Sequence, residues 1–327
     1  MLIDFDKGVE KPNTYRGSEK KTKLMYNDEL YMIKYPDPIR EGTRLEGLLS
    51  YKNNHFSEFI GSSIFAACGF KAQEVYLGYL TNAATQKKKL VVGCKDFTQD
   101  GSTLYEIAQL SNQAMIEHKW TGTSIENIPL IVEASTLNIS PKEVTSSFWE
   151  MFVVDALIGN ADRHFGNWGL MEKGNDVFFA PIYDCCSSLG ALLFDHQMEE
   201  IIKNPGVFKN KEYNIASCYY MDTERIRYHE IFKNPPLPLA QAIKRILPRI
   251  DMDKITKIIN DTPVMSDSRK QYLNKSLELR YTQILRPSLK KVLELEKLVY
   301  PELFQEAKPQ KNTQPLKTEP QPKPRTR

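Results

Sequence analysis

The segment Leu-Ile-Gly-Asn-Ala-Asp-Arg-His-Phe-Gly-Asn, residues 157–167, says most about the fold of this 327-residue chain. Ser-Pro-Lys-Glu at residues 140–143 is a capping box with proline at the first helical position, so a helix is predicted over residues 141–157. Gly-Asn at residues 159–160 ends this helix. A polar loop over residues 161–166 therefore follows directly after a helix.

Two strands are predicted after this loop, over residues 167–171 and 177–183, with a turn at residues 173–175 between them. Asp184 follows the second strand directly. The order is thus helix, polar loop, strand pair and acid. We expect the loop and the end of the second strand to face the same way.

The residues before this segment predict a small sheet that carries one helix. Four strands are expected there, over residues 24–26, 30–35, 75–80 and 90–95. Apolar residues recur at helical spacing over residues 55–68, and Gly69 provides a C-terminal stop. We assign residues 1–98 to a β-rich N-lobe with one helix.

The residues after this segment are mostly helical, with apolar periodicity from about residue 237 to residue 300. Residues 99–305 are assigned to a mainly α C-lobe, so the expected fold class is α+β with two lobes. Residues 306–327 form a basic tail with five of the 19 prolines and no aromatic residue, and disorder is predicted for it. The tail is either a solvated terminus or a segment that binds an acidic surface or an aromatic groove.

Composition argues against several classes of protein. The 44 Lys and Arg residues against 41 Asp and Glu give a net charge of +3, with much of the positive charge in the tail, so DNA binding is not expected. No uncharged run reaches the roughly 18 residues that a membrane-spanning helix needs, and the acidic start does not resemble a signal peptide. The five cysteines contain no Cys-x-x-Cys pair, so neither a disulfide framework nor structural zinc is expected. A cytoplasmic protein is predicted.

Asp162, Asn167 and Asp184 are the candidate catalytic residues. Phosphoryl transfer needs a carboxylate that orients the acceptor hydroxyl and takes its proton, and it needs oxygen ligands for a divalent metal. Asp162 and Asn167 have the Asp-x₄-Asn spacing typical of a kinase catalytic loop, and Asp184 stands where a second metal-binding acid is expected. Ordinary turn chemistry remains open, as does a metal-hydrolase site that includes His164 but lacks a second histidine.

A nucleotide site of this kind also needs a lysine on a strand and a glutamate on a helix. Lys34 lies in an otherwise apolar strand, and Glu58 lies in the predicted N-lobe helix. A polar loop over residues 16–22, with the single glycine Gly17, is a candidate for covering phosphates. The alternatives are an edge-strand charge for Lys34, a solvated helix residue for Glu58 and a surface turn for the loop.

Taken in order, these segments resemble the HipA-like kinases over residues 12 to about 300. The likeness is carried by Gly-Ser-Glu-Lys-Lys-Thr-Lys-Leu at residues 17–24, Ile-Lys-Tyr-Pro at 33–36, Ser-Glu at 57–58, the segment 157–167, and Pro-Ile-Tyr-Asp at 181–184. The resemblance implies a bilobal protein-kinase-like fold. It also implies an ATP-dependent serine/threonine protein kinase that phosphorylates itself as well as other proteins.

The resemblance assigns roles to the residues of the catalytic segment. It implies that Asp162 is the catalytic base and that Asn167 and Asp184 hold Mg²⁺. His164 is expected to support the loop.

The resemblance also assigns the nucleotide contacts. It implies that Lys34, held by Glu58, contacts the phosphates of ATP. The other contacts are expected in the covering loop and in a hinge over residues 93–97, namely at Gly17, Ser18, Lys95, Asp96 and Phe97.

Phosphorylation of the covering loop is a further expectation. HipA carries a regulatory phosphoserine just before the loop glycine, and Thr14 and Ser18 are the corresponding candidates for autophosphorylation. A phosphate there would lie beside Arg16, Lys20 and Lys21 and would draw the loop away from ATP.

HipA toxins carry an additional N-terminal subdomain, whereas this chain reaches the covering loop almost at once, so an antitoxin partnership is not expected. The short build with a basic tail resembles a stand-alone bacterial member of the family, which implies export from the bacterial cytoplasm and action on host proteins. Two alternatives stay open: a phosphatidylinositol or small-molecule kinase, and an ATP-binding scaffold without catalysis. The vicinal pair Cys185-Cys186 is expected to pack beneath the site rather than to act in redox chemistry.

Overall fold

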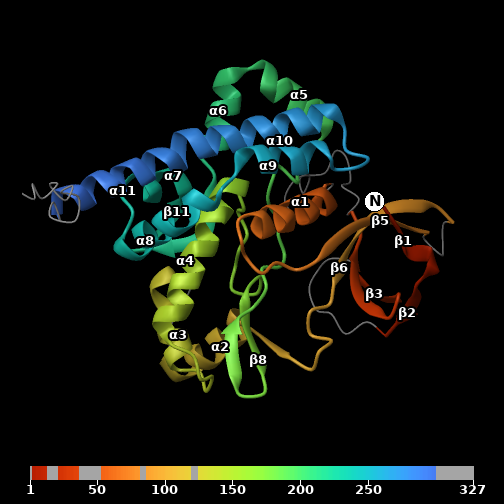
Figure 1. The fold of residues 1–327 in the computed structure, drawn as a ribbon, viewed down its shortest axis with the longest axis horizontal. Helices are drawn as coiled ribbons and strands as arrows, with labels where there is room; N and C mark the ends of the chain where they lie inside the picture. The colour runs from red at the N-terminus through yellow and green to blue at the C-terminus, as the bar shows by residue number, and fades with distance from the viewer. Residues whose placement is uncertain (1, 13–20, 37–52, 82–85, 119–123, 300–327) are drawn as a thin grey trace, which may run out of the picture. The chain divides into compact units, whose positions relative to one another are not determined.

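The computed structural model describes residues 2–12, 21–36, 53–81, 86–118 and 124–299. The N-terminal part forms a six-stranded sheet with the order β1-β5-β6-β4-β3-β2 (Figure 1). Neighbouring strands are antiparallel except for β1 and β5, which are parallel. The strands are β1 Ile3–Asp4, β2 Val9–Lys11, β3 Lys21–Tyr26, β4 Glu29–Lys34, β5 Val75–Thr81 and β6 Lys88–Lys95.

The four strands expected from the sequence are β3 to β6, and each lies within a few residues of its predicted position. Asn27 and Asp28, both with positive φ, form the tight turn between β3 and β4, as hairpins joined by two residues favour. The sequence did not predict β1 and β2, because strands of two and three residues are too short to show an alternating pattern.

The helix α1, Asn54–Ala67, packs against β5 and β6. Ile60 and Ile64 of this helix are fully buried in the main hydrophobic core together with Leu77 and Val92 of the sheet. Phe5 belongs to a second, smaller core. Its other buried members are Leu24, Tyr31, Ile33 and Val91. The sheet is therefore covered by apolar contacts on both faces.

Gly93 gives Phe5 the room it occupies. A Cβ added at Gly93 would lie 2.3 Å from Cζ of Phe5, far inside normal contact. Gly93→Ala is therefore expected to lower the free energy of unfolding by about 1–3 kcal/mol through overpacking, as measured by urea denaturation. The double variant Gly93→Ala with Phe5→Leu is expected to lose less than the sum of the two single changes, and strict additivity would contradict this explanation.

The helix α4, Pro141–Ile158, lies in the main hydrophobic core and packs against α3, α8 and α10. Most of its residues from Val144 onward are buried. The other helices are α2 Ile107–His118, α3 Ile128–Glu133, α5 Asp195–Lys203, α6 Pro205–Tyr213, α7 Tyr228–Lys233, α8 Leu237–Ile246, α9 Met252–Asn260, α10 Asp267–Arg280 and α11 Arg286–Val299. A π-helical turn, Tyr281–Leu285, joins α10 to α11, and three-residue 3₁₀ turns lie at Phe5–Lys7, Ile125–Asn127 and Leu247–Arg249.

The start and end of α4 agree with the predicted helix, but its capping box is not formed. Pro141 is the first helical residue, yet the side chain of Ser140 makes no capping hydrogen bond. The backbone carbonyl of Ser140 accepts from Val144 instead, and burial of the apolar residues fixes the helix. At the other end Gly159 takes a left-handed conformation with φ of 66°, which ends the helix as expected.

A three-stranded antiparallel sheet, in the order β7-β8-β9, carries the segment that follows α4. Its strands are β7 Thr103–Glu106, β8 Gly169–Lys173 and β9 Asp176–Phe179. The two predicted strands of this segment are present, but β8 starts two residues later than expected and β9 ends at Phe179. Residues 180–183 form no strand, apart from a bridge between Ala72 and Ile182. A further hairpin, β10 Ala216–Met221 and β11 Glu224–Arg227, was not predicted.

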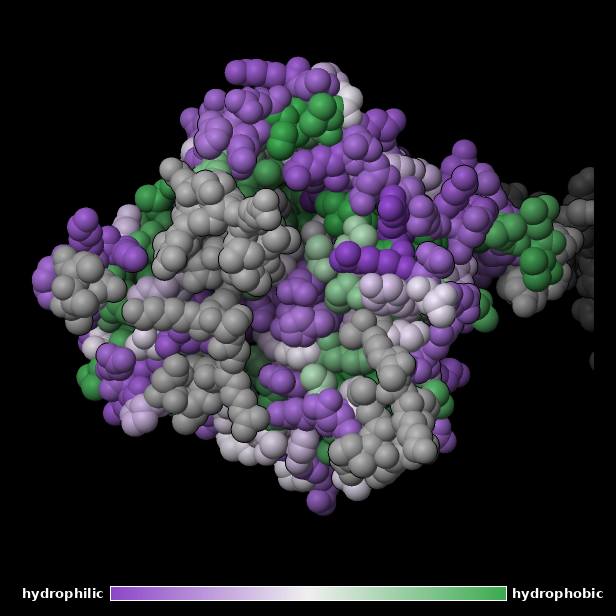
Figure 2. Space-filling model, turned by 180° about the vertical axis from the view of Figure 1, so that it is seen from behind, coloured by the Kyte–Doolittle hydropathy of each residue, from purple (hydrophilic) through white to green (hydrophobic). Residues whose placement is uncertain are grey.

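The described residues up to Val292 form one compact unit, and Leu293–Val299 do not belong to it. The expected lobe boundary between residues 98 and 99 lies inside this unit and stays a prediction. The tail over residues 306–327 lies outside the described residues. Within the described ranges, no helix is long and apolar enough to cross a membrane. Figure 2 shows a face on which hydrophilic residues predominate and hydrophobic residues gather in smaller groups.

Candidate active site

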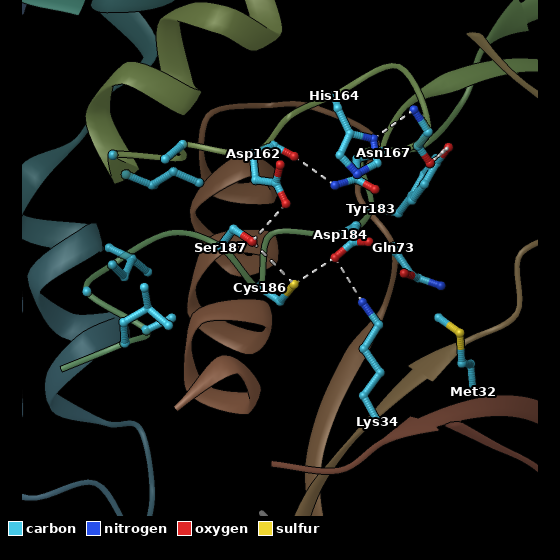
Figure 3. A pocket seen from close by; sticks show the side chains of 18 of the residues that line it. Met32, Lys34, Gln73, Asp162, His164, Asn167, Tyr183, Asp184, Cys186 and Ser187 are labelled. Carbon is cyan, nitrogen blue, oxygen red and sulfur yellow. Dashed lines mark hydrogen bonds and ion pairs between the residues drawn. The ribbon is translucent and has the colours of Figure 1, made fainter. Parts of the chain in front are cut away.

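A cavity of about 1010 Å³ brings most of the predicted site residues together (Figure 3). Its walls come from β4, the residues after β6, the loop after α4 and the segment after β9. The predicted site residues that line it are Lys34, Asp96, Phe97, Asp162, His164, Asn167 and Asp184.

Lys34, Glu58 and Asp184 form a buried ionic cluster although they are far apart in the sequence. Nζ of Lys34 lies 3.0 Å from Oε2 of Glu58 and 3.1 Å from Oδ1 of Asp184. The second oxygen of Glu58 accepts a hydrogen bond from the backbone N–H of Cys185 at 3.2 Å. Glu58 is fully buried behind Lys34 and does not line the cavity, so it positions the lysine and the turn after Asp184.

The electrostatics of this cluster keep both of its cavity-lining members charged. Burial alone would lower the pKa of Lys34, but Asp184 and Glu58 outweigh it and hold that pKa well above its usual value. Burial likewise favours a raised pKa for Asp184, but Lys34 and the thiol of Cys186 hold that pKa well below its usual range. A permanently ionised carboxylate therefore faces the cavity near neutral pH.

The turn at Asp184 is held by short contacts of the two cysteines that follow it. Asp184 has a positive φ of 56°, which a non-glycine residue adopts only when its surroundings fix it. The Cys186 thiol donates to Oδ1 of Asp184 at 2.9 Å (Figure 3). Both cysteines are buried, and burial raises the pKa of Cys185 to about 12. The Cys185 thiol is therefore protonated and packs beneath the site rather than acting as a thiolate.

The candidate catalytic loop, residues 160–167, is closed by hydrogen bonds between its own residues. Nδ2 of Asn167 donates to the backbone carbonyl of Asp162 at 2.8 Å, and Oδ1 of Asn160 accepts from the backbone N–H of Asp162 at 3.1 Å. The Ser187 hydroxyl lies 3.5 Å from Oδ2 of Asp162. Among the described residues, neither Oδ1 of Asp162 nor Oδ1 of Asn167 accepts a hydrogen bond. Within the described part of the chain, both oxygens therefore remain available to a ligand.

The environment of Asp162 favours a proton more than that of Asp184 does. Burial raises the pKa of Asp162 above its usual value, and the negative charge of Asp184 adds to this, while His164 opposes it. The carboxylates of Asp184 and Asp162 thus differ in character: that of Asp184 is held ionised, and that of Asp162 can take up a proton.

Arg163 joins the loop to the Asp184 turn, and the sequence analysis assigned it no role. It is buried, and its Nε lies 3.0 Å from Oδ2 of Asp155 in α4. Its Nη1 donates to the backbone carbonyls of Asn167 at 3.0 Å, of Asp184 at 3.1 Å and of Tyr183. One guanidinium therefore positions both segments that carry the candidate catalytic residues.

The sequence holds a partial signal for the pair of Asp155 and Arg163. Asp155 is an acid within the otherwise apolar run Phe-Val-Val-Asp-Ala-Leu-Ile, residues 152–158, and a fully buried acid requires a partner. Arg163 lies eight residues later, directly after the candidate base. The sequence places Arg163 in a polar loop, however, and nothing in its spacing shows that the loop folds inward.

His164 lines the cavity, and within the described residues its side chain makes no hydrogen bond to Asp162 or Asp184. Its Nδ1 accepts from the backbone N–H of Gly166 at 3.0 Å (Figure 3). A Cβ at Gly166 would lie 3.0 Å from the imidazole, so glycine lets the loop fold closely over the ring. His164 therefore stabilises the shape of the loop.

The other end of the cavity is lined by Met32, Gln73, Asp96, Phe97, Thr98 and Tyr183. The rings of Phe97 and Tyr183 lie 5.8 Å apart. The Asp96 carboxylate accepts from the backbone and hydroxyl of Thr98, so it caps a turn. The thioether of Met32 and the rings of Phe97 and Tyr183 give this end apolar surfaces, and nearby backbone groups can form hydrogen bonds. Such a lining suits a flat heteroaromatic ring.

Of the remaining predicted nucleotide contacts, the structure describes only Lys95. Lys95 does not line the cavity, because its Nζ pairs with Glu29 at 3.0 Å and with Glu74 at 3.7 Å on the surface. Its backbone carbonyl accepts from Nε2 of Gln73, which does line the cavity. Gly17, Ser18 and Thr14 lie outside the described residues.

Comparison with known proteins shows the family to which this arrangement of residues belongs. The HipA-like C-terminal domain family matches residues 14–229. The chain belongs to this family. The HipA-like kinase family expected from the sequence is thereby confirmed, and the match spans the ionic cluster, the catalytic loop and the Asp184 turn.

Within this family, the chain is similar in sequence and in structure to the kinase CtkA. The serine/threonine-protein kinase CtkA of Helicobacter pylori is 36% identical over 282 residues, which cover 84% of this chain and 83% of the relative. The crystal structure of a Helicobacter pylori proinflammatory kinase CtkA matches with a TM-score of 0.81 and 34% identity, over 90% of this chain and 99% of that one. The expected similarity to a stand-alone member of the family is confirmed.

A more distant HipA-like structure shows the shared fold. HipA of Shewanella oneidensis, solved with HipB and operator DNA, matches with a TM-score of 0.52 and 15% identity, over 86% of this chain and 68% of that one. Together with the CtkA structure, this match confirms the kinase-like α+β fold that the sequence predicted.

Proposed function

We propose that this chain transfers the γ-phosphoryl group of ATP to serine or threonine hydroxyls of proteins, with Asp162 as the catalytic base. The observation that carries the proposal is the single cavity that contains Lys34, Asp162, Asn167 and Asp184. The enzyme class itself, a serine/threonine kinase, is confirmed by the similarity to CtkA over most of both chains. The residue roles, the metal and the substrates given below are proposals.

ATP is proposed to bind with its base between Met32 and the Phe97–Tyr183 pair and with its phosphates at Lys34. The lysine is held by Glu58, so its ammonium is fixed in place before the nucleotide arrives. Gly17 and Ser18 are proposed to cover the phosphates. Lys95 is proposed to contribute only through its backbone, because its side chain pairs with surface acids.

Asn167 and Asp184 fit a divalent metal such as Mg²⁺. Oδ2 of Asp184 accepts no hydrogen bond within the described residues, since Lys34 and Cys186 both use Oδ1. The amide of Asn167 uses its nitrogen for Asp162, which leaves the amide oxygen unengaged by described residues. Oxygen ligands of this kind suit Mg²⁺, which when bound neutralises charge on the β- and γ-phosphates.

The transfer step follows from these positions. The acceptor hydroxyl binds with its hydrogen toward Oδ1 of Asp162, which receives the proton as the acceptor oxygen bonds to the γ-phosphorus. The bond from that phosphorus to the bridging oxygen breaks, and its electron pair leaves with ADP. Lys34 balances the charge on the phosphates during this exchange, and Asp162 later returns the proton to solvent.

The pH dependence of kcat should show an acid limb set by Asp162. The base works only when ionised, and its pKa is raised, so kcat is expected to fall as pH drops through a value above the usual pKa of about 3.9. Asp184 stays ionised over this range, because its pKa is lowered. Rates measured from pH 4.5 to 8 check this, and a His164→Gln variant should keep the limb. A flat profile down to the lowest pH would contradict the assignment.

The finer biology is proposed from the family resemblance. We propose autophosphorylation at Thr14 or Ser18, export from the bacterial cytoplasm, and action on host proteins as a bacterial effector. We also propose that the basic tail over residues 306–327 binds an acidic or aromatic partner.

The test is phosphate transfer from labelled MgATP by the whole chain, with Asp184→Ala as the inactive control. Label on serine or threonine, mapped by mass spectrometry and absent from the control, is the expected result. Label on a lipid or small molecule but not on protein would replace the proposal with the phosphatidylinositol or small-molecule alternative. Tight ATP binding without any transfer would indicate a scaffold.

A further inference from the structure

The cavity continues beyond Asp162, away from the nucleotide end. We call this part the acceptor region, and the inference about it rests on the proposed kinase function. Its lining residues are Gly159, Ala161, residues 189–193, Ile215, Lys211, Glu212 and Arg280. Figure 3 shows side chains made of carbon alone on the side of Asp162 and Ser187 that faces away from Met32 and Gln73.

The backbone next to the candidate base forms one wall of the acceptor region. Gly159 ends α4 with φ of 66°, and a Cβ there would lie 2.8 Å from Cδ1 of Ile215 and 3.2 Å from Cζ of Arg280. The backbone N–H of Leu189 donates to the carbonyl of Ile158 at 3.0 Å. We call the apolar lining residues 189–193 and Ile215 the apolar floor, and Lys211 with Arg280 the basic end. Both parts contact the segment that leads into the loop with Asp162.

The basic end contains donors that the fold does not use. Lys211 is exposed on α6 and makes no hydrogen bond or ion pair in the described part of the chain. Arg280 is 1% exposed, and its Nε donates to the carbonyl of Leu157 at 2.6 Å. Its Nη2 is buried and has no hydrogen-bond partner among the residues that the structure describes. A buried guanidinium N–H without an acceptor is unusual, since nearly all such groups are hydrogen-bonded.

The acid at this end cannot neutralise both cations. Glu212 is buried and accepts from Nη1 of Arg280 with one oxygen and from the Tyr272 hydroxyl with the other. Both of its oxygens are thus engaged on the side of α10. Lys211 and Nη2 of Arg280 thus remain as cationic donors that no described residue uses, so this part of the acceptor region carries net positive charge.

We propose that the acceptor region binds an anionic side chain close to the phosphorylated serine or threonine. The apolar floor receives the peptide beside the acceptor hydroxyl, and Lys211 and Arg280 receive the anion. Charge-assisted hydrogen bonds to a carboxylate or a phosphoryl group are the contacts that such donors favour. The substrate class is therefore a Ser/Thr peptide with an acidic or previously phosphorylated residue nearby.

A charge reversal at Lys211 tests the proposal with little risk to folding, because this side chain is exposed. Peptides carry glutamate, glutamine or lysine at one position at a time on either side of the acceptor serine. The wild-type chain should prefer one glutamate position by about fivefold in kcat/KM over glutamine, the size of a good exposed ion pair. Lys211→Glu should reverse this preference in favour of lysine. Lys209→Glu, an equal charge change at an exposed residue of α6 that does not line the cavity, should leave it unchanged.

Binding separates failure of this inference from failure of the proposed function. The same peptides, and versions with phosphoserine in place of glutamate, are titrated into the full chain loaded with a non-hydrolysable ATP analogue. Tighter binding of glutamate peptides that Lys211→Glu abolishes supports the acceptor region even without transfer. Stronger binding of phosphoserine peptides would identify phosphoryl as the preferred anion. Equal binding of all peptides by wild type and Lys211→Glu would overturn the inference.

Discussion

Asp162→Asn is expected to lower kcat by about 10²- to 10⁴-fold while KM for ATP changes little. Asparagine keeps the size of the side chain and the two backbone hydrogen bonds that hold residue 162 to Asn160 and Asn167. What is lost is the carboxylate that accepts the proton. Single-turnover transfer to protein and calorimetric binding of the ATP analogue measure the two effects separately.

The prediction for Asp162→Asn requires that the rate of transfer falls while the binding of ATP is retained. Asp184→Asn is the informative comparison, because it should impair the metal-dependent binding of ATP as well as the rate. If Asp162→Asn retained more than about a tenth of wild-type kcat, the group would not act as general base. If it lost ATP binding instead, its role would be that of a nucleotide contact.

Arg163→Met is expected to lower the free energy of unfolding by about 3–5 kcal/mol, because it leaves the carboxylate of Asp155 buried without its charge partner. Activity should fall too, since the carbonyls of Asn167 and Asp184 lose their shared donor. Urea denaturation and the transfer assay measure the two losses.

The double variant Asp155→Leu with Arg163→Met separates stability from positioning. It should regain part of the lost stability, because no unpaired charge remains buried, although Asn160 loses an acceptor. Activity should stay low, because the carbonyl contacts are still missing. Recovery of both stability and activity would show that the guanidinium does not position the loop.

Local sequence signals were sufficient for the elements that frame the site. Helix α4, the hairpin of β3 and β4, and helix α1 all have strong periodicity or clear stop residues, and all lie where they were predicted. The catalytic spacing was equally readable, because Asp162 and Asn167 lie in one loop. Their mutual hydrogen bond is a local contact.

The contacts that join distant segments could not be read in the same way. The pairing of Lys34 with Asp184 spans 150 residues, and the sequence analysis did not predict it. The partners of Arg163 depend on a loop that turns inward, and the direction of the Lys95 side chain depends on Glu29 and Glu74 across the sheet. Spacing along the chain carries no information about such cross-strand and cross-loop partners.

The two hydrogen bonds of the Glu58 carboxylate have a consequence for how the site can change. One oxygen holds the ammonium of Lys34 and the other holds the backbone of Cys185, so a single side chain on α1 governs both the phosphate contact and the Asp184 turn. A rotation of α1 that released one oxygen would release the other as well. A movement of α1 that broke both contacts would separate Lys34 from Glu58 and free the Asp184 turn in one step.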